Sequence, residues 1–176
     1  MDYTMNALVL GGTGFLGTSL KKEFPSFTYW GTKTYRVETT PNTLILDYVK
    51  SNDITHVIDF TKNNHNHIVP AIRLINSLEN VIYVHISTYG VMFDNMFLHE
   101  EEYYSTKSII EKSIRKIDYS IRVPMILETQ DYDKIFKGVR TEYMYTLEPK
   151  EFVTSLMDIL SKPSGHYVMP SRILYK

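Results

Sequence analysis

The chain contains no cysteine, and this absence excludes disulfide bonds, thiolate zinc sites and a cysteine nucleophile. It also has no apolar run approaching the roughly 20 residues that a membrane-spanning helix requires. A secretory signal has a long apolar run near its start, but here the charged residue Asp2 comes early and no such run follows it. We therefore expect a soluble, cytoplasmic protein with no membrane partner. The net charge of -1 gives no strong attraction to nucleic acid, so we expect none as a partner.

Several catalytic signatures are also missing. The chain has neither the Gly-x-Ser-x-Gly turn of serine hydrolases nor the His-Glu-x-x-His motif of zinc proteases. His65 and His67 stand two residues apart, which does not place them on one helix face, so we expect a solvated helix start and no metal. His85 lies inside an apolar run and is expected to be a hydrogen-bonded core residue. The acidic run Glu100 to Glu102 predicts a solvated helix N-terminus.

The composition fits a single domain. The 176 residues are 43% hydrophobic and 22% charged, an ordinary balance for a globular protein with a full core. The sequence shows no internal repeat and no linker rich in proline, glycine or serine. We therefore expect residues 1–176 to fold as one unit.

Short apolar runs alternate with helical patterns along the chain, which predicts strands alternating with helices. We expect strands at 5–10, 27–30, 56–60, 81–86, 119–127 and 166–169. We expect helices at 18–24, 44–50, 68–78, 104–116 and 149–160, with Thr43 capping the second and Pro149 in the first turn of the last. This order predicts a doubly wound parallel sheet with its ligand site at the carboxyl ends of the strands.

A glycine-rich turn follows the first predicted strand. Gly11, Gly14 and Gly17 are spaced three residues apart and lie where a strand gives way to a helix. This spacing allows a tight turn, a close approach to a pyrophosphate and close packing of helix on strand. Thr18 follows the last glycine where a P-loop needs lysine, so the turn favours dinucleotide binding. A glycine-rich turn with no ligand is the alternative.

The stretch from Gly11 to Gly17 resembles the opening fingerprint of the extended short-chain dehydrogenase/reductase family, the nucleotide-sugar epimerases and reductases. The resemblance extends to about Leu127 and more faintly to the end of the chain. It implies an α/β Rossmann domain that binds NAD or NADP, with 128–176 as a reduced substrate-binding region. The cofactor-binding residues that it implies in the turn and after the third strand are Gly11, Thr13, Gly14, Phe15, Leu16, Gly17, Phe60, Thr61 and Lys62.

Tyr103 and Lys107 are four residues apart, so they share one face of the predicted helix. A lysine ammonium near a phenol lowers the tyrosine pKa from about 10 toward working pH. Such a tyrosine can pass a proton to or from a substrate oxygen while hydride moves at the carbon. The pair resembles the family's catalytic Tyr-x-x-x-Lys, which implies that Lys107 also holds the nicotinamide ribose. Tyr104 is a competing phenol, but it is only three residues from Lys107.

Ser87 and Thr88 follow the predicted strand at 81–86 and resemble the family's strand-end hydroxyl segment. By this resemblance Thr88 would hydrogen-bond the substrate oxygen, whereas a strand-terminating turn is the alternative. Sugar dehydratases of the family continue with Asp-Glu, but this chain continues with Tyr89-Gly90. Dehydration is therefore disfavoured, and both keto reduction and 4-epimerisation remain open, with a tilt toward the reductases.

The choice of cofactor depends on the residues after the second strand. An acid there would bind the ribose hydroxyls of NAD, but no acid follows Trp30. Lys33 and Arg36 are placed to meet the 2′-phosphate of NADP, which gives NADP a slight preference over NAD; an exposed surface lysine is the alternative for Lys33. Asp47 and Tyr48 resemble the segment that approaches adenine in the reductases.

Two departures from the family pattern bear on function. Thr61 and Lys62 stand where the family has small residues, so Lys62 either pairs with a phosphate or crowds the nicotinamide. Only about fifty residues follow Pro124, fewer than sugar-modifying members have. We predict hydride transfer at a keto or hydroxyl carbon of a nucleotide-sugar; the alternative is a non-catalytic dinucleotide sensor or regulatory subunit. By the same resemblance, helices 68–78 and 104–116 would pair across a homodimer.

Overall fold

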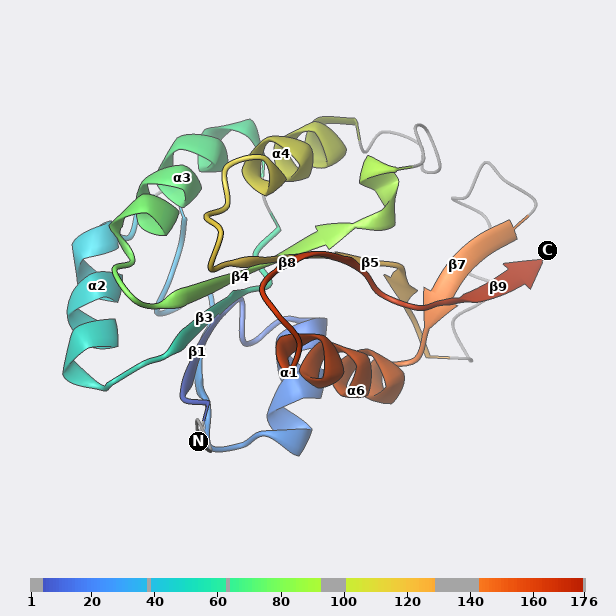
Figure 1. Cartoon of the computed structure of the whole chain (residues 1–176), viewed down its shortest axis with the longest axis horizontal. Coiled ribbons are helices and arrows are strands. Elements are labelled where there is room, and N and C mark those ends of the chain that lie inside the picture. The colour runs from blue at the N-terminus through green and yellow to red at the C-terminus, as the bar shows by residue number, and fades with distance from the viewer. Residues whose placement is uncertain (1–4, 38, 63, 93–100, 129–142, 176) are drawn as a thin grey trace.

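The computed structural model describes residues 5–37, 39–62, 64–92, 101–128 and 143–175. Its centre is a six-stranded sheet with all neighbouring strands parallel, in the order β2-β1-β3-β4-β5-β8 (Figure 1). The strands are β1 (Ala7–Leu10), β2 (Thr28–Trp30), β3 (His56–Asp59), β4 (Ile82–Thr88), β5 (Tyr119–Val123) and β8 (Gly165–Val168). The alternation of strands and helices in the sequence predicted this parallel sheet, and the structure confirms it.

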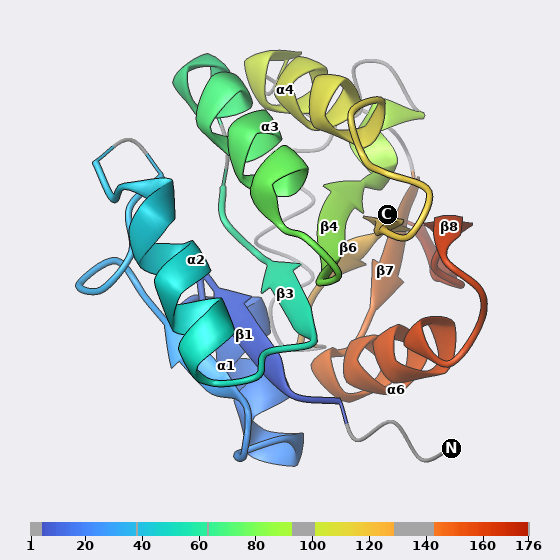
Figure 2. The same cartoon turned by 60° about the vertical axis from the view of Figure 1, so that its left-hand side comes forward.

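Helices cover both faces of the sheet, as a doubly wound Rossmann-type fold requires. Helices α1 (Phe15–Glu23) and α6 (Pro149–Leu160) lie on one face, and α2 (Asn42–Ser51), α3 (Ile68–Ser77) and α4 (Glu101–Glu111) lie on the other (Figures 1 and 2). Leu20 and Phe152 belong to the core under α1 and α6. Leu74 and Ile110 belong to the core under the other three helices. Burial of these apolar faces provides the main stabilisation of the sheet.

Some helix ends differ from the expected ones. Helix α2 begins at Asn42 with Pro41 as its N-cap, so Thr43 lies inside the helix instead of capping it. Helix α4 ends at Glu111, although apolar spacing predicted helix to residue 116. The backbone N–H of Arg115 donates instead to the carboxylate of Asp118 at 2.9 Å. This local bond stabilises a turn and ends the helix early.

A second, three-stranded sheet lies in the carboxyl-terminal part of the chain. It contains β6 (Met125–Ile126), β7 (Tyr143–Leu147) and β9 (Arg172–Tyr175) in the order β6-β7-β9. The expected strand at 119–127 is divided into β5 and β6 at Pro124, which has no N–H to continue a ladder. Two 3₁₀ helices, η1 (His65–His67) and η2 (Tyr89–Val91), complete the described elements.

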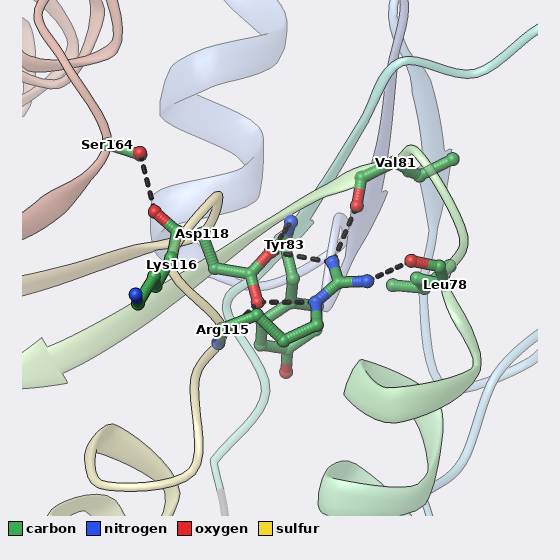
Figure 3. Close-up of polar contacts among 7 residues, drawn as sticks. All are labelled: Leu78, Val81, Tyr83, Arg115, Lys116, Asp118 and Ser164. Atoms are coloured by element: carbon green, nitrogen blue, oxygen red, sulfur yellow. Dashed lines mark hydrogen bonds and ion pairs between the residues drawn. The ribbon is translucent and has the colours of Figure 1, made fainter.

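A polar clasp ties together elements at the amino ends of the strands. The Arg115 guanidinium lies between the Asp118 carboxylate and the carbonyl oxygens of Leu78 and Val81 (Figure 3). Asp118 also accepts the backbone N–H of Tyr83 at 2.9 Å. The clasp therefore joins the end of α3 to the starts of β4 and β5, which leaves the carboxyl ends of the strands for a ligand. No helix in the described ranges combines the length and apolar character needed to cross a membrane.

Candidate functional site

The glycine turn joins β1 to α1 with little space for side chains. Gly11 has φ +77°, and a Cβ there would lie 3.0 Å from the carbonyl carbon of Phe60. A Cβ on Gly17 would lie 2.5 Å from the Cα of Gly12, so only glycine allows this packing of helix on turn. Gly14 is the N-cap of α1, and no side chain caps the helix there. The first N–H groups of α1 can therefore receive an anionic ligand.

A cleft of about 720 Å³ opens at the carboxyl ends of β1 and β3. The chain leaves β1 toward one face of the sheet and β3 toward the other, so the cleft lies at a topological switch point, where such sheets bind ligands. Its volume is in the range of small-molecule and cofactor sites. The cleft is lined by six of the predicted cofactor-binding residues: Gly11, Thr13, Gly14, Phe60, Thr61 and Lys62.

Lys107 is fixed beneath this end of the sheet. It is 1% exposed, and its Nζ donates to the carbonyl oxygen of Ile86 at 2.8 Å and of Thr61 at 3.2 Å. Burial lowers the pKa of Lys107 to about 8, although the charges of Asp59 and Glu111 act to raise it. The ammonium is thereby held between the chain segment after β3 and strand β4.

Tyr103 is the tyrosine of α4 that meets this lysine. The Nζ atoms of Lys107 and Lys62 each lie 5.7 Å from the centre of the Tyr103 ring. Tyr104 packs against η2, where a Cβ on Gly90 would lie 2.0 Å from the Tyr104 ring. Helix α4 thus places one phenol beside the two lysines and uses the other for packing.

The strand-end hydroxyls have different environments. Thr88 ends β4, and its Oγ1 accepts the backbone N–H of Gly90 at 3.2 Å, capping η2. This is the turn contact that the sequence offered as the alternative role, and it leaves the Thr88 hydroxyl hydrogen able to donate. Ser87 is 1% exposed, and its Oγ has no hydrogen-bond partner among the described residues.

Asp59 is a site residue that sequence reasoning missed. It is 3% exposed and accepts from the backbone N–H of Thr61 at 2.8 Å and from the hydroxyl of Tyr83. Through these bonds it fixes Thr61, whose carbonyl holds Lys107. The available signal was an acid ending an apolar strand, because such a buried carboxylate needs polar partners.

The expectation of a hydrogen-bonded His85 was wrong. The ring is fully buried, and neither nitrogen has a hydrogen-bond partner among the described residues. Burial lowers the pKa of His85 well below its usual value; the Lys107 charge lowers it further, and the nearby Lys107 backbone opposes the shift. His85 therefore stays neutral beside the buried ammonium.

The expected solvated start at 65–67 is only half correct. His65 is exposed and lies 3.9 Å from the Glu102 carboxylate, but His67 is 5% exposed and lines the cleft. The His67 Nδ1 accepts the backbone N–H of Asn64 at 3.0 Å, which assigns the proton of the neutral ring to Nε2. Within the described ranges, no group of three His, Asp or Glu residues is arranged to hold a metal ion.

The segment after β2 supplies one basic side chain to the cleft. Arg36 lines it together with Thr32, and the Arg36 Nε donates to the Thr32 carbonyl at 3.2 Å. Lys33, the other predicted phosphate partner, is exposed on the turn and does not line the cleft. Arg36 is therefore the better placed of the two.

Six other predicted cofactor contacts are not among the residues that line the cleft: Phe15, Leu16, Gly17, Asp47, Tyr48 and Lys107. Phe15 and Leu16 form the first turn of α1, and Phe15 is 50% exposed. Asp47 is exposed on α2, and Tyr48 packs its ring 4.8 Å from that of Trp30. The structure thus puts Asp47 and Tyr48 on the helix beside β2, where Tyr48 contacts Thr28 and Trp30.

Comparison with solved structures shows the same fold in nucleotide-sugar enzymes. The chain resembles the NAD complex of dTDP-glucose 4,6-dehydratase from Bacillus anthracis (TM-score 0.73, 13% identity, covering 98% of this chain and 77% of that one). It resembles UDP-N-acetylglucosamine 4-epimerase from Bacillus cereus (TM-score 0.67, 17% identity, covering 97% of this chain and 80% of that one). It also resembles the NADP complex of dTDP-4-dehydrorhamnose reductase from Bacillus anthracis (TM-score 0.69, 11% identity, covering 97% of this chain and 76% of that one).

Sequence comparison adds no closer relative. No protein-family model matches the chain, and no curated protein sequence matches it. The structural neighbours belong to the NAD-dependent epimerase/dehydratase superfamily. At identities of 11 to 17% this likeness establishes the Rossmann fold of the chain, and the activity must be argued from the site.

Proposed function

We propose that this chain is an NAD(P)-dependent oxidoreductase or epimerase of the short-chain dehydrogenase/reductase type, acting at a keto or hydroxyl carbon of a nucleotide-sugar. One observation carries the proposal: the switch-point cleft that begins at Gly14 is also lined by Lys62, whose ammonium faces the Tyr103 ring beside Lys107. A phosphate cradle and a proton-transfer pair are the two parts that this chemistry needs.

The residues of the cleft fit a dinucleotide. Gly11 and Gly14 keep the turn free of side chains, and the uncapped N-terminus of α1 favours a pyrophosphate. Phe60 and Thr61 form the wall after β3, and Lys107 lies directly beneath Thr61. When bound, the nicotinamide would supply the hydride acceptor or donor.

Tyr103 and Lys107 provide the proton chemistry. The phenol would give a proton to the substrate oxygen in reduction and take it back in oxidation. Lys107 stabilises the phenolate and is itself fixed by the carbonyl oxygens of Ile86 and Thr61. The Thr88 hydroxyl, which accepts from Gly90, would donate its own hydrogen to the same substrate oxygen.

The region 128–176 would form the reduced substrate-binding part of the single domain. Tyr89, one residue beyond Thr88, donates its hydroxyl hydrogen to the Met169 carbonyl, and its ring lies 5.4 Å from the ring of Tyr145 on β7 at a tilt of 58°. The small sheet therefore packs beside the end of β4, where the substrate oxygen would lie. Arg36 in the cleft and the absence of an acid directly after Trp30 support NADP over NAD.

The Tyr103→Phe variant tests this function. Removal of the hydroxyl should lower turnover of a dTDP- or UDP-linked 4-keto sugar with NADPH at least 100-fold. The dissociation constant for NADPH, measured by fluorescence titration, should change less than about twofold, because the phosphate cradle is intact. Tyr104→Phe is the matched control and should retain activity. Full turnover by Tyr103→Phe, or no affinity of the wild type for any nicotinamide dinucleotide, would contradict the proposal.

A non-catalytic dinucleotide sensor is the second candidate. The observation in its favour is the turn contact of Thr88, which already occupies one lone pair of the predicted catalytic hydroxyl. This candidate predicts saturable NADPH binding without turnover of any 4-keto sugar, and an unchanged NADPH affinity in Thr88→Val. The turnover assay of the wild type separates the two candidates.

A further inference from the structure

Two ammonium groups from different elements approach the ring of Tyr103. Lys107 comes from α4 and Lys62 from the segment after β3, and each Nζ lies 5.7 Å from the ring centre. The two lysines differ in environment. Lys107 is buried under the sheet end, whereas Lys62 is exposed on the wall of the cleft. A cation at this distance from an aromatic ring is attracted to it, and more strongly once the phenol loses its proton.

We propose that Lys62 is a positioning residue of the proton-transfer step: it acts as a second positive partner of the Tyr103 phenolate. The inference rests on the proposed function only in taking Tyr103 as the proton donor. Two of the three Lys107 donors are already directed at the carbonyl oxygens of Ile86 and Thr61. Lys62 therefore adds a second cation near the ring. Lys62 is exposed to solvent, whereas Lys107 is buried.

The other charged groups near Tyr103 are engaged elsewhere. On η1, His65 pairs with Glu102 at 3.9 Å. Asp59, whose charge acts on Lys107, accepts hydrogen bonds from Thr61 and Tyr83. Glu111, further along α4, forms a two-pronged ion pair with Arg122, with its shortest contact at 2.8 Å. The two lysines thus contact the Tyr103 ring from two different elements.

The chain contains its own reference for this contact. The Nζ of Lys21 lies 5.6 Å from the centre of the Tyr29 ring, and neither residue lines the cleft. Burial raises the pKa of Tyr29 to about 12, and its hydroxyl donates to the Phe24 carbonyl. At Tyr29 the effect of burial on the pKa therefore outweighs that of the lysine over the ring. Substitution of Lys21 provides a matched control for substitution of Lys62.

Direct titration of the Tyr103 phenol tests the inference. Tyrosine labelled with ¹³C at Cζ gives one NMR signal per residue, and Tyr103→Phe identifies the signal of Tyr103. In Lys62→Gln the midpoint of this signal should move upward by about one pH unit. Lys62→Arg, which keeps the charge, should restore the wild-type midpoint, and Lys21→Gln should leave it unchanged. An unmoved midpoint in Lys62→Gln would overturn the inference.

The experiment separates this inference from the proposed function. The titration uses the protein without a dinucleotide, so a failure of NADPH binding would remove the proposed function without changing the Tyr103 result. NADPH titration of Lys62→Gln tests the competing role of Lys62 as a phosphate ligand. A tenfold loss of NADPH affinity with an unmoved Tyr103 midpoint would assign Lys62 to the phosphate and overturn the inference. Because Lys62 is exposed, we expect both variants to keep the wild-type circular dichroism spectrum.

Discussion

Arg36 is the residue on which the choice between NADP and NAD depends. It lines the cleft beside Thr32 and carries a guanidinium suited to a phosphate. In Arg36→Gln we expect NADPH affinity to fall about tenfold, since one charge-assisted contact is worth about 1.4 kcal/mol or more. NADH affinity should change less than about twofold, because NADH has no 2′-phosphate. Calorimetric titration with both cofactors measures the difference; an equal loss for the two would contradict the assignment.

His85 makes the stability of the fold depend on pH. Burial lowers its pKa in the folded state well below the value of 6.5 that it regains on unfolding. The unfolded chain therefore binds more protons below pH 6.5, so this contribution to stability is present above pH 6.5 and is lost as pH falls. We expect His85 to account for about 1 kcal/mol of lost unfolding free energy between pH 7 and pH 5.5.

Urea unfolding at the two pH values measures this effect. His85→Leu is nearly isosteric and should remove that part of the pH dependence, because leucine has no proton to bind. His166→Gln, a substitution of an exposed histidine on β8, is the control and should unfold with the wild-type pH dependence. If His85→Leu keeps the full wild-type loss at low pH, the imidazole of His85 is not its source.

At the scale of the elements, the sequence predicted the main sheet well and the small sheet poorly. Strands β1, β3, β4 and β5 are mostly buried, so their positions followed from hydrophobicity, and α6 has the predicted ends, Pro149 and Leu160. Strand β9 gave no such signal, since most of its residues are exposed and it depends on pairing with β7. Helix α4 was predicted too long because its limit depends on Asp118, a contact that apolar spacing does not encode.

The candidate site was predictable where it depends on local spacing. The glycine turn, Tyr103 and Lys107 could be identified because each motif lies within one turn or helix. Asp59 was missed, since its role depends on Tyr83 from the neighbouring strand. Asp47 is exposed on α2 and does not line the cleft, and the direction in which a helix residue points depends on packing of the whole element.

The clasp between α3, β4 and β5 leads to a prediction of stability without loss of binding. Asp118 is fully buried and pairs with Arg115 at 2.6 Å. Asp118→Ala should lower the unfolding free energy by about 3 kcal/mol, because it leaves the guanidinium without its counter-ion and the Tyr83 N–H without its acceptor. Asp158→Ala, which breaks the exposed pair with Lys162, should cost less than about 0.5 kcal/mol.

Urea unfolding gives both values. NADPH titration should show that folded Asp118→Ala binds normally, because the clasp lies at the amino ends of the strands and the cleft at their carboxyl ends. Equal destabilisation by the two aspartate substitutions would mean that the clasp contributes no more than an ordinary surface pair.

The whole molecule presents an apolar face that suits a second copy of the chain. Helices α3 and α4 lie side by side on one face of the sheet (Figures 1 and 2), and they expose Val69 at 54% and Ile109 at 38%. A two-fold axis beside these helices would bring four helices together and bury both side chains, as a self-complementary dimer interface requires.

We therefore expect a homodimer, which Ile109→Glu should weaken at least tenfold by placing a carboxylate in the interface. Light scattering on size-exclusion fractions measures the mass. Val168→Glu, which changes a 53% exposed residue on β8, should leave the dimer intact. A monomeric wild type, or an unchanged dimer in Ile109→Glu, would exclude this interface.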